Sequence, residues 1–183
     1  AWTEGQQAFA REQAQEGASL VCYGRGTRLL AVLAVADPVK PTSAEAIRRL
    51  QEEEHVEVHI LTGDSAAAAG AVARRLGVAH VEAGVLPQGK EDYVRALQAG
   101  GRVVAMVGDG INDSQALARA DVSVAMGRGT DIAMDVAMLT LMTSDLSLLS
   151  EAIHLSRRTV RIIRENLFWA FIYNLIAVPV AAG

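Results

Sequence analysis

The 183-residue sequence contains one cysteine, Cys22, and this scarcity excludes several classes of protein. A single cysteine can form neither an internal disulfide nor a thiolate metal cluster, so a reducing, cytosolic setting fits the chain. Because Cys22 falls in a strand-like apolar run, we expect it to be a small buried hydrophobic residue rather than a metal ligand.

The sequence also lacks an excess of positive charge, a signal peptide, and any repeat or low-complexity tract. The formal net charge is -4, so no affinity for nucleic acid is expected. The N-terminus carries no secretory signal, and its first residues read as the inside of a helix, as an internal cut in a longer protein would give. The Glu52-Glu53-Glu54 run is expected to be a solvated helix end. The histidines stand at no ligand spacing and are expected to be structural or exposed: His55, His59, His80 and His154.

What the sequence does contain is an apolar, β-branched stretch that ends in glycines and carboxylates. Residues 104–107 run into Gly108-Asp109-Gly110-Ile111-Asn112-Asp113. Such a run suits a strand buried on both faces of a sheet, and the glycines let the backbone turn sharply at its end. Asp113 can then cap a short helix over 114–119. Ligands bind at the carboxyl edge of open α/β sheets, so Asp109 and Asp113 predict a Mg2+ site; the alternative is a simple Asp-Gly turn with a helix cap.

A second strand, loop and helix precede this unit. Residues 56–61 read as a strand that runs into Thr62-Gly63-Asp64, and the Ala-rich helix that follows is closed by Gly77. Between the two units, Lys90 stands at the start of another helix. A hydroxyl, a cation and a carboxylate on neighbouring loops suit a phosphoryl group, because the first two bind its oxygens and the third holds a bridging metal.

The alternation of strands and helices predicts an α/β fold, in which a Rossmann-like parallel sheet is covered on both faces. Strands are expected at 56–61, 80–82, 103–107, 122–126 and 139–142, and helices at 66–76, 91–99, 114–120 and 131–136. A helix with Thr3 as its cap and Gly17 as its stop, and then a hairpin that turns at 24–27, precede this region. The proline-stiffened residues 37–41 are the expected boundary, and Thr42 with Glu45 forms a capping-box pattern.

The C-terminal region is basic first and apolar afterwards. Asp145 can cap a last helix, whose arginines are Arg157, Arg158, Arg161 and Arg164. Residues 166–183 then run for 18 residues without a charge. Since about 20 apolar residues span a bilayer, this stretch predicts a truncated transmembrane helix with its basic end in the cytoplasm. The alternative is an apolar core helix, which Pro179 would break.

These motifs together resemble the later motifs of the haloacid-dehalogenase-type phosphorylation domain of P-type ATPases, in the heavy-metal branch and copper exporters most of all. They are Thr62-Gly63-Asp64, Lys90 and residues 108–113, and the likeness runs from about Val32 to Gly183. The family's Asp-Lys-Thr-Gly-Thr run, which carries the phosphorylated aspartate, and its Cys-Pro-Cys membrane motif do not occur in this sequence. The resemblance implies the C-terminal part of a pump: residues 1–36 as the tail of a nucleotide-binding domain, 37–145 as the phosphorylation domain, and 146–183 as a connecting helix with a truncated transmembrane helix.

The resemblance also implies roles for single residues. Asp109 would ligate Mg2+, Thr62 would hold the phosphoryl group, Lys90 would neutralise it, and Asp113 would support or share the Mg2+ site. Asp64 would orient the loop of Thr62. Gly63 and Gly110 would allow bound groups to approach closely, and the cofactor would be bound at Gly108, Gly110 and Asn112. ATP would be the substrate, and the intact protein would be a multi-pass membrane protein with residues 1–165 in the cytoplasm. Its partners would be the lipid bilayer, the pump's N-terminal domains and a copper chaperone.

One further pattern concerns the transported ion. Tyr173-Asn174 followed by Pro179 resembles the copper-exporter pattern of Tyr-Asn, four residues, then Pro, and implies Cu+ as cargo. Phenol and amide oxygens are poor ligands for this soft ion, so sulfur ligands elsewhere would have to complete the site. The alternative makes Tyr173 an interface anchor and Asn174 a helix–helix hydrogen-bond donor.

Two other functions fit part of the sequence. A soluble phosphatase of the same superfold, acting on a small phosphorylated metabolite, would explain Asp109, Thr62 and Lys90 but not the arginine-flanked apolar tail. A non-catalytic fragment that binds metal or partners would explain the missing nucleophile. Because electrostatic stabilisers without a nucleophile give no covalent intermediate, we expect this chain alone to be inactive.

Overall fold

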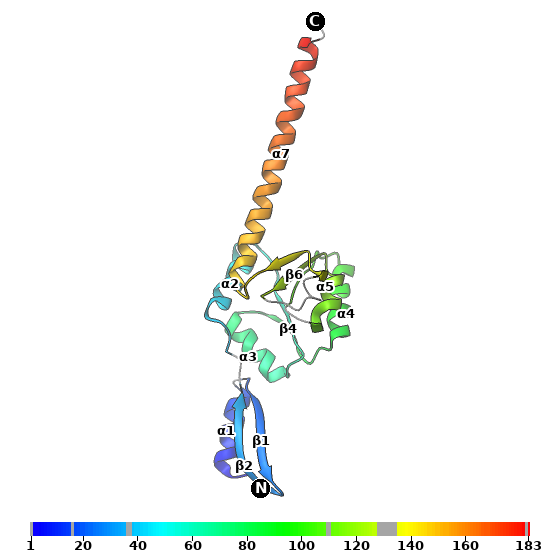
Figure 1. The fold of residues 1–183 in the computed structure, drawn as a ribbon. Coiled ribbons are helices and arrows are strands. Elements are labelled where there is room, and N and C mark those ends of the chain that lie inside the picture. Colours follow the sequence, from blue (N-terminus) through cyan, green and yellow to red (C-terminus); the bar gives the residue numbers. More distant parts are fainter. Residues whose placement is uncertain (1, 16, 36–37, 109–110, 128–134, 182) are drawn as a thin grey trace.

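The computed structural model describes residues 2–15, 17–35, 38–108, 111–127, 135–181 and 183. Figure 1 shows a small N-terminal unit, an α/β body, and a long C-terminal helix that extends from the body. The elements are α1 (Glu4–Gln15), β1 (Ser19–Arg25), β2 (Arg28–Val35), α2 (Pro41–Glu52), β3 (His59–Leu61), α3 (Ala66–Leu76), β4 (His80–Glu82), α4 (Pro87–Ala99), β5 (Ala105–Gly108), a 3-10 turn (Ile111–Asp113), α5 (Ser114–Arg119), β6 (Val122–Met126), β7 (Leu139–Leu141) and α7 (Ser147–Ala181).

The N-terminal unit is α1 with the antiparallel hairpin β1–β2. Thr3 caps α1 as predicted, because its Oγ1 accepts from the Gln6 N–H at 3.3 Å. Gly17 ends the helix with a φ of 87°, and a Cβ there would lie 3.1 Å from the Ala68 Cα of α3, so glycine permits the contact with the body. The prediction that Cys22 is buried is wrong: Cys22 is exposed, since a two-stranded hairpin has too few neighbours to cover it.

The body has the predicted α/β fold with parallel strand pairing. Strand β3 pairs with β4, and β5, β6 and β7 pair in that order, all in parallel. The prediction of one continuous sheet is wrong for the described residues, whose parallel strands form two separate ladders. The expected strand over 56–61 is also shorter, because only His59–Leu61 pair with a neighbour. Within the described chain, β3 and β5 each have one paired edge.

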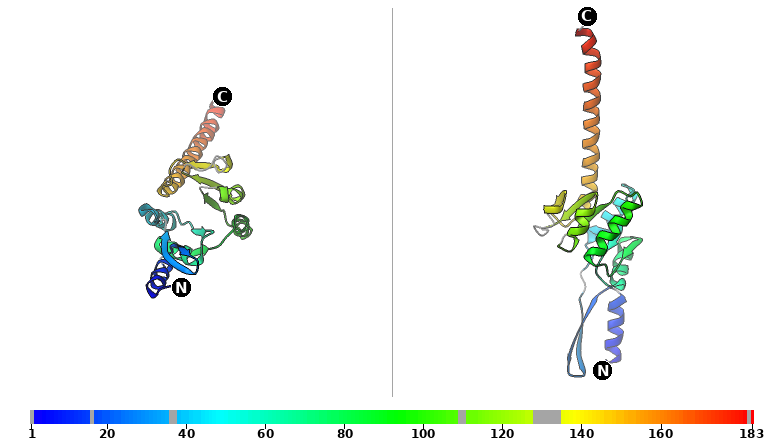
Figure 2. Two further views of the ribbon diagram at one scale, coloured as in Figure 1. Left: turned by 60° about the horizontal axis from the view of Figure 1, so that its bottom comes forward. Right: turned by 90° about the vertical axis from the view of Figure 1, so that its right-hand side faces the viewer.

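The start of α7 links the cores beneath the two ladders. Leu146 and Leu149 pack against two buried clusters, one made by α2 and the chain after α3, the other by the strands β6 and β7. The first cluster contains Ile47, Leu50 and Val78, and the second contains Val124, Met126 and Leu141. Because both ladders pack on the same two leucines, α7 is part of the core at its base even though the rest of it extends outward (Figure 2).

A buried carboxylate fastens α7 to the end of α2. The Glu54 side chain is 0% exposed, and its oxygens accept from the Ser150 hydroxyl at 3.3 Å and from the Arg157 guanidinium, while His154 Nε2 lies 2.9 Å from Oε1. The expectation of a solvated helix end is therefore wrong for Glu54. The cause is a tertiary contact. The side-chain partners of Glu54 all lie on α7, about a hundred residues later in the sequence, and this helix covers the carboxylate.

Of two predicted helix caps, one is absent and the other is present. The capping box of Thr42 and Glu45 does not form, because α2 begins at Pro41, Glu45 pairs with Arg48 at 2.6 Å, and the Thr42 hydroxyl points to Asp145 Oδ1 at 3.4 Å. Asp145 does cap α7 as predicted: its Oδ1 accepts from the Ser147 N–H at 3.1 Å. This backbone hydrogen bond holds the pKa of Asp145 below its ordinary value.

Helix α7 is continuous through Pro179, two residues before its end. Most of its apolar side chains are exposed beyond the base, so the alternative of a core helix is wrong. In the part of the chain that the structure describes, no helix has both the length and the apolar character needed to cross a bilayer. The predicted truncated transmembrane helix over 166–183 is therefore not confirmed.

Loss of the Arg157 side chain should weaken the junction of α2 and α7. In Arg157→Ala the buried Glu54 carboxylate loses a charged hydrogen-bond donor, which we expect to lower the free energy of unfolding by about 2 kcal/mol. Urea unfolding followed by circular dichroism measures this loss. The matched control is Arg158→Ala, whose exposed side chain neighbours Arg157 on α7. Equal midpoints for the two variants would contradict an anchoring role for Glu54.

Candidate functional site

An ion pair between two loops forms the centre of the candidate site. Lys90 Nζ in α4 lies 2.6 Å from Asp113 Oδ1, and both side chains are 13% exposed. Lys90 belongs to the helix that follows β4, whereas Asp113 follows β5, so the contact fixes the start of α4 against the turn after β5. Lys90 therefore contacts the 108–113 motif through Asp113, whereas the predicted meeting is with Asp109. Partial burial lowers the local dielectric and strengthens this interaction relative to a surface pair.

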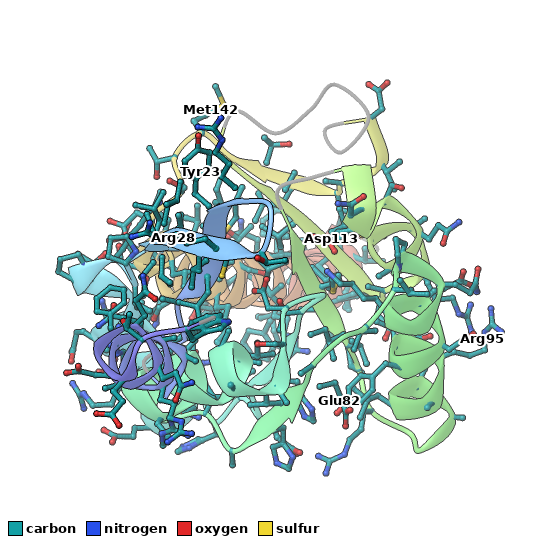
Figure 3. All side chains as sticks on the ribbon, turned by 90° about the horizontal axis from the view of Figure 1, so that it is seen from below. Tyr23, Arg28, Glu82, Arg95, Asp113 and Met142 are labelled. Atoms are coloured by element: carbon teal, nitrogen blue, oxygen red, sulfur yellow. The ribbon has the colours of Figure 1, made fainter. Side chains whose placement is uncertain are left out.

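The backbone at the end of β5 is shaped for Asp113. A Cβ on Gly108 would lie 2.9 Å from both the Cβ and Oδ2 of Asp113, so only glycine lets the carboxylate fold against the strand end. The predicted role of Asp113 as a side-chain cap of α5 is wrong, because its side chain makes no cap hydrogen bond and reaches Lys90 instead. In Figure 3, Asp113 lies within the body, whereas Arg95 of α4 lies at its outer margin.

The second half of the site is the loop after β3. The Thr62 hydroxyl donates to Asp64 Oδ2 at 2.8 Å and accepts from the Asp64 N–H at 3.1 Å, so Asp64 orients Thr62 as the resemblance implied. Backbone hydrogen bonds tie this loop to the one that leads into α4: the Val85 N–H donates to Thr62 O at 2.9 Å, and the Gly84 N–H to Asp64 O at 2.8 Å. The loops of Thr62 and Lys90 are therefore fastened together by the backbone.

The structure gives less information about the other residues that were predicted to belong to the site. Asp109 and Gly110 lie outside the described residues, so the meeting of Asp109 with Thr62 and Lys90 stays a prediction. Asn112 is exposed. A Cβ on Gly63 would meet only Val85 O at 3.7 Å, an ordinary contact, so the protein itself does not require glycine there.

Tyr173 and Asn174 lie on α7, apart from the ion pair and the Thr62 loop. The Tyr173 side chain is 71% exposed. The Asn174 amide donates to the Ala170 carbonyl of its own helix at 2.9 Å, rather than to a second helix. A role for either residue in binding a transported metal remains a prediction.

The donor set at Asp113 fits a Mg2+ ion. Its Oδ1 is bonded to Lys90, which leaves Oδ2 as a hard oxygen donor at the carboxyl end of β5. Mg2+ is held in proteins by one or two carboxylates together with water and phosphate oxygens. A single described carboxylate beside a lysine therefore suits a site that a second carboxylate and a phosphate would complete.

The sequence reasoning missed a cluster at the opposite end of β3. His59 and His80 were expected to stand apart, but the parallel ladder places them in register, with their rings stacked at 4.5 Å. Glu57 Oε1 lies 3.2 Å from His59 Nε2 and 3.3 Å from His80 Nε2. The sequence did contain one signal for this cluster. Glu57 and His59 are two residues apart in the predicted strand over 56–61, and residues two apart on a strand face the same side.

Comparisons with known proteins agree with the motif likeness. A family model described as haloacid dehalogenase-like hydrolase matches residues 1–121. A silver exporting P-type ATPase of Salmonella typhimurium is 47% identical over 180 residues, which cover 98% of this chain and 22% of that protein. Copper-transporting ATPase 2 of Rhizobium meliloti is 53% identical over 156 residues, 85% of this chain and 19% of that protein. The chain thus spans about a fifth of the length of these two relatives.

Solved structures support the same likeness. A zinc-transporting PIB-type ATPase superposes with a TM-score of 0.84 at 34% sequence identity, covering 98% of this chain and 30% of that one. A second structure of a zinc-transporting PIB-type ATPase, in a different state, gives a TM-score of 0.79 at 33% identity, covering 96% of this chain and 30% of that one. The resemblance to heavy-metal P-type ATPases is therefore confirmed by both sequence and structure.

A double-mutant cycle should show that the Lys90–Asp113 pair stabilises the body. Lys90→Met and Asp113→Ala should each be destabilising, and the double variant should reveal a coupling energy of about 2 kcal/mol, since contacting residues in partly buried pairs are coupled. Thermal or urea unfolding of the four proteins gives this energy.

A second ion pair on the same helix provides the control. Glu91 and Arg95 lie 2.5 Å apart with side chains 20% and 54% exposed, so their coupling should be about 0.5 kcal/mol. Coupling energies of equal size in both cycles would mean that the Lys90–Asp113 contact behaves as a surface pair.

Proposed function

Because this chain belongs to the haloacid dehalogenase-like hydrolases, we propose that it forms the phosphorylation-domain part of an ATP-driven heavy-metal transporter of the P-type. The contact between Lys90 and Asp113 is the main support, because it brings a cation to the carboxylate motif that follows β5. The named relatives add support, since they are silver and copper transporters. They also disfavour the alternative of a soluble phosphatase for a small metabolite.

In the proposed reaction, Thr62 and Lys90 bind and orient the phosphoryl group. The Thr62 hydroxyl, now bonded to Asp64, can rotate to donate to a phosphoryl oxygen while Asp64 keeps its loop in place. The Lys90 ammonium carries three donors, so it can neutralise a phosphoryl oxygen while retaining its bond to Asp113. Such fixed donors stabilise the charge that develops during phosphoryl transfer. Asp109 and Asp113 would hold Mg2+, which when bound supplies positive charge to the phosphate oxygens.

The nucleophile would come from outside this chain. We propose that the aspartate of an Asp-Lys-Thr-Gly-Thr run lies on a strand that fills the space between β3 and β5, and so joins the two ladders into one sheet. Two observations support this placement: β3 and β5 each have an unpaired edge within the described chain, and the chain spans about a fifth of its relatives. The residues at the carboxyl ends of β3 and β5 would then flank the aspartate. Without it, this chain alone would be inactive.

The cargo and cellular setting follow from the same proposal. We propose Cu+ as the transported ion, with Tyr173 and Asn174 contributing to a site whose sulfur ligands lie elsewhere in the pump. The pump would be an integral membrane protein, with the body in the cytoplasm and α7 joining it to the membrane part. The N-terminal domains of the same pump would be its partners, and a copper chaperone would deliver the ion.

Phosphorylation by ATP tests the catalytic part of the proposal. In the full-length protein, Lys90→Met should lower the rate of formation of the acid-stable phosphoenzyme by about 100-fold, because one preorganised donor is lost. Asp109→Asn and Thr62→Ala should also be impaired, whereas Arg95→Ala on the outer side of α4 should match the parent. Radiolabelled ATP followed by acid precipitation measures the product.

The 183-residue chain provides the second arm of this experiment. We expect it to take up no label, since its nucleophile would be absent. Label on the chain alone that survives in Asp109→Asn would mean that another of its residues is the nucleophile. Unchanged rates in full-length Lys90→Met would exclude the proposed role of Lys90.

Metal-stimulated ATP hydrolysis tests the cargo. In the full-length pump, the double variant Tyr173→Phe, Asn174→Ala should lose stimulation by Cu+ but keep phosphorylation by inorganic phosphate, because the metal site is affected and the catalytic site is not. Trp169→Phe on the same helix is the control. Full copper stimulation in the double variant would reduce Tyr173 and Asn174 to packing residues and favour another metal as cargo.

A further inference from the structure

We propose that Glu57, His59 and His80 form a second metal site, which takes a divalent transition-metal ion such as Zn2+ and is separate from both the phosphoryl site and the transported ion. The ligand atoms of these three side chains all lie within 4.8 Å of one another. The cluster lies at the amino end of β3, and Thr62 follows the carboxyl end of this strand three residues later. At about 3.3 Å per residue, the two sites are about 10 Å apart along the chain.

The backbone fixes the arrangement of the two histidines. His59 and His80 are direct partners in the parallel ladder of β3 and β4. Neighbouring strands lie about 4.8 Å apart, so two residues in register stand side by side, and their rings here stack at 4.5 Å with an interplanar angle of 18°. Glu57 lies two residues before β3, and its Oε1 is within 3.3 Å of the Nε2 atoms of both histidines. Strand pairing thus places two of the three ligands.

The spacing is close to what a metal ion requires. Zinc lies about 2.1 Å from nitrogen and oxygen ligands, so two ligands of a tetrahedral ion are about 3.4 Å apart. Glu57 Oε1 already lies 3.2 Å and 3.3 Å from the two Nε2 atoms. Rotation of the imidazoles out of their stacked arrangement would direct both nitrogen lone pairs at one ion and leave its fourth position to water.

A hydrogen bond outside the three ligands favours metal binding by His59. The Tyr93 hydroxyl lies 2.9 Å from His59 Nδ1, and the His59 side chain is 16% exposed. If Nδ1 of His59 carries the hydrogen and donates a hydrogen bond to the Tyr93 oxygen, Nε2 has a lone pair that can bind the ion. A metal-bound histidine usually has such a partner on its other ring nitrogen.

The main competing explanation is a local ion-pair network. Arg102 Nη2 lies 3.1 Å from Glu57 Oε2, and a cation near the carboxylate opposes a second one. However, the Arg102 side chain is 65% exposed and engages only Oε2, so it can turn into solvent and leaves Oε1 to the ion. The side chains of His80 and Glu57 are 51% and 42% exposed, which gives an ion direct access.

The donor set selects the class of ion. Two imidazoles and one carboxylate suit Zn2+, Ni2+ and Cu2+, whereas Mg2+ prefers oxygen ligands alone and Cu+ prefers sulfur. A bound ion would clamp β3 to β4 at the end opposite the candidate phosphoryl site, and Tyr93 would link this clamp to α4. Since the ion binds only the folded arrangement, it would stabilise the body.

Zinc titration of the metal-stripped 183-residue chain tests the proposal. Isothermal titration calorimetry should show one Zn2+ per chain and no competition from Mg2+. The double variant His59→Gln, His80→Gln should weaken binding by at least about 100-fold, and Tyr93→Phe, which keeps all three ligands, by about 10-fold. A matched histidine outside the cluster serves as control: His55→Asn should bind like the parent, because asparagine tolerates the positive φ of 57° at that position.

If the histidine variants unfold, a variant of the exposed ligand Glu57 still tests the proposal. Glu57→Gln replaces one carboxylate oxygen of an exposed side chain with an amide nitrogen. This variant should retain the circular dichroism of the parent while losing most of the zinc affinity. A parent chain that binds no Zn2+ at millimolar concentration would overturn the proposal. Equal zinc affinity in the parent, Glu57→Gln and the double histidine variant would also overturn it, since the ion would then be bound elsewhere.

Discussion

The contact between Lys90 and Asp113 is the constraint on which the candidate site depends, because it fixes the start of α4 against the turn that follows β5. Lys90 is carried by the helix after β4, and Asp113 by the turn after β5. Gly108 makes the contact possible, since any side chain there would collide with Asp113. One partly buried charge pair therefore positions the groups proposed to meet a phosphoryl group.

The base of α7 provides a second connection, and it is apolar as well as ionic. Leu146 and Leu149 pack against the cores of both ladders, while the Glu54 carboxylate contacts Ser150, His154 and Arg157 on the next turns of α7. A movement between the ladders would therefore be felt at the start of this helix. In the proposed pump, such a junction would pass changes at the phosphoryl site to the membrane part.

Much of the candidate site was predictable from the sequence because its residues follow a regular rule. Strand-like runs that end in Thr62-Gly63-Asp64 and in the 108–113 motif lead to one edge of a parallel arrangement, and a helix beginning before Lys90 returns there. Such patterns are local, so the sequence contains them in full. The pairing of Thr62 with Asp64 is equally local, and Asp64 was expected to orient the loop of Thr62.

The remaining features were decided by tertiary contacts between distant parts of the chain. The run of three glutamates predicted a solvated helix end, but α7 folds over Glu54 and buries it. The spacing of the histidines suggested no common site, but strand pairing brings His59 and His80 together across 21 residues. Cys22 looked like a core residue, yet it is exposed on its two-stranded hairpin. The sequence by itself determined the type and order of most elements and the loops of the candidate site, because periodicity and turn chemistry act over a few residues. Only the tertiary structure decided the burial of Glu54, the break between the ladders and the histidine cluster, because each depends on which distant segments come into contact.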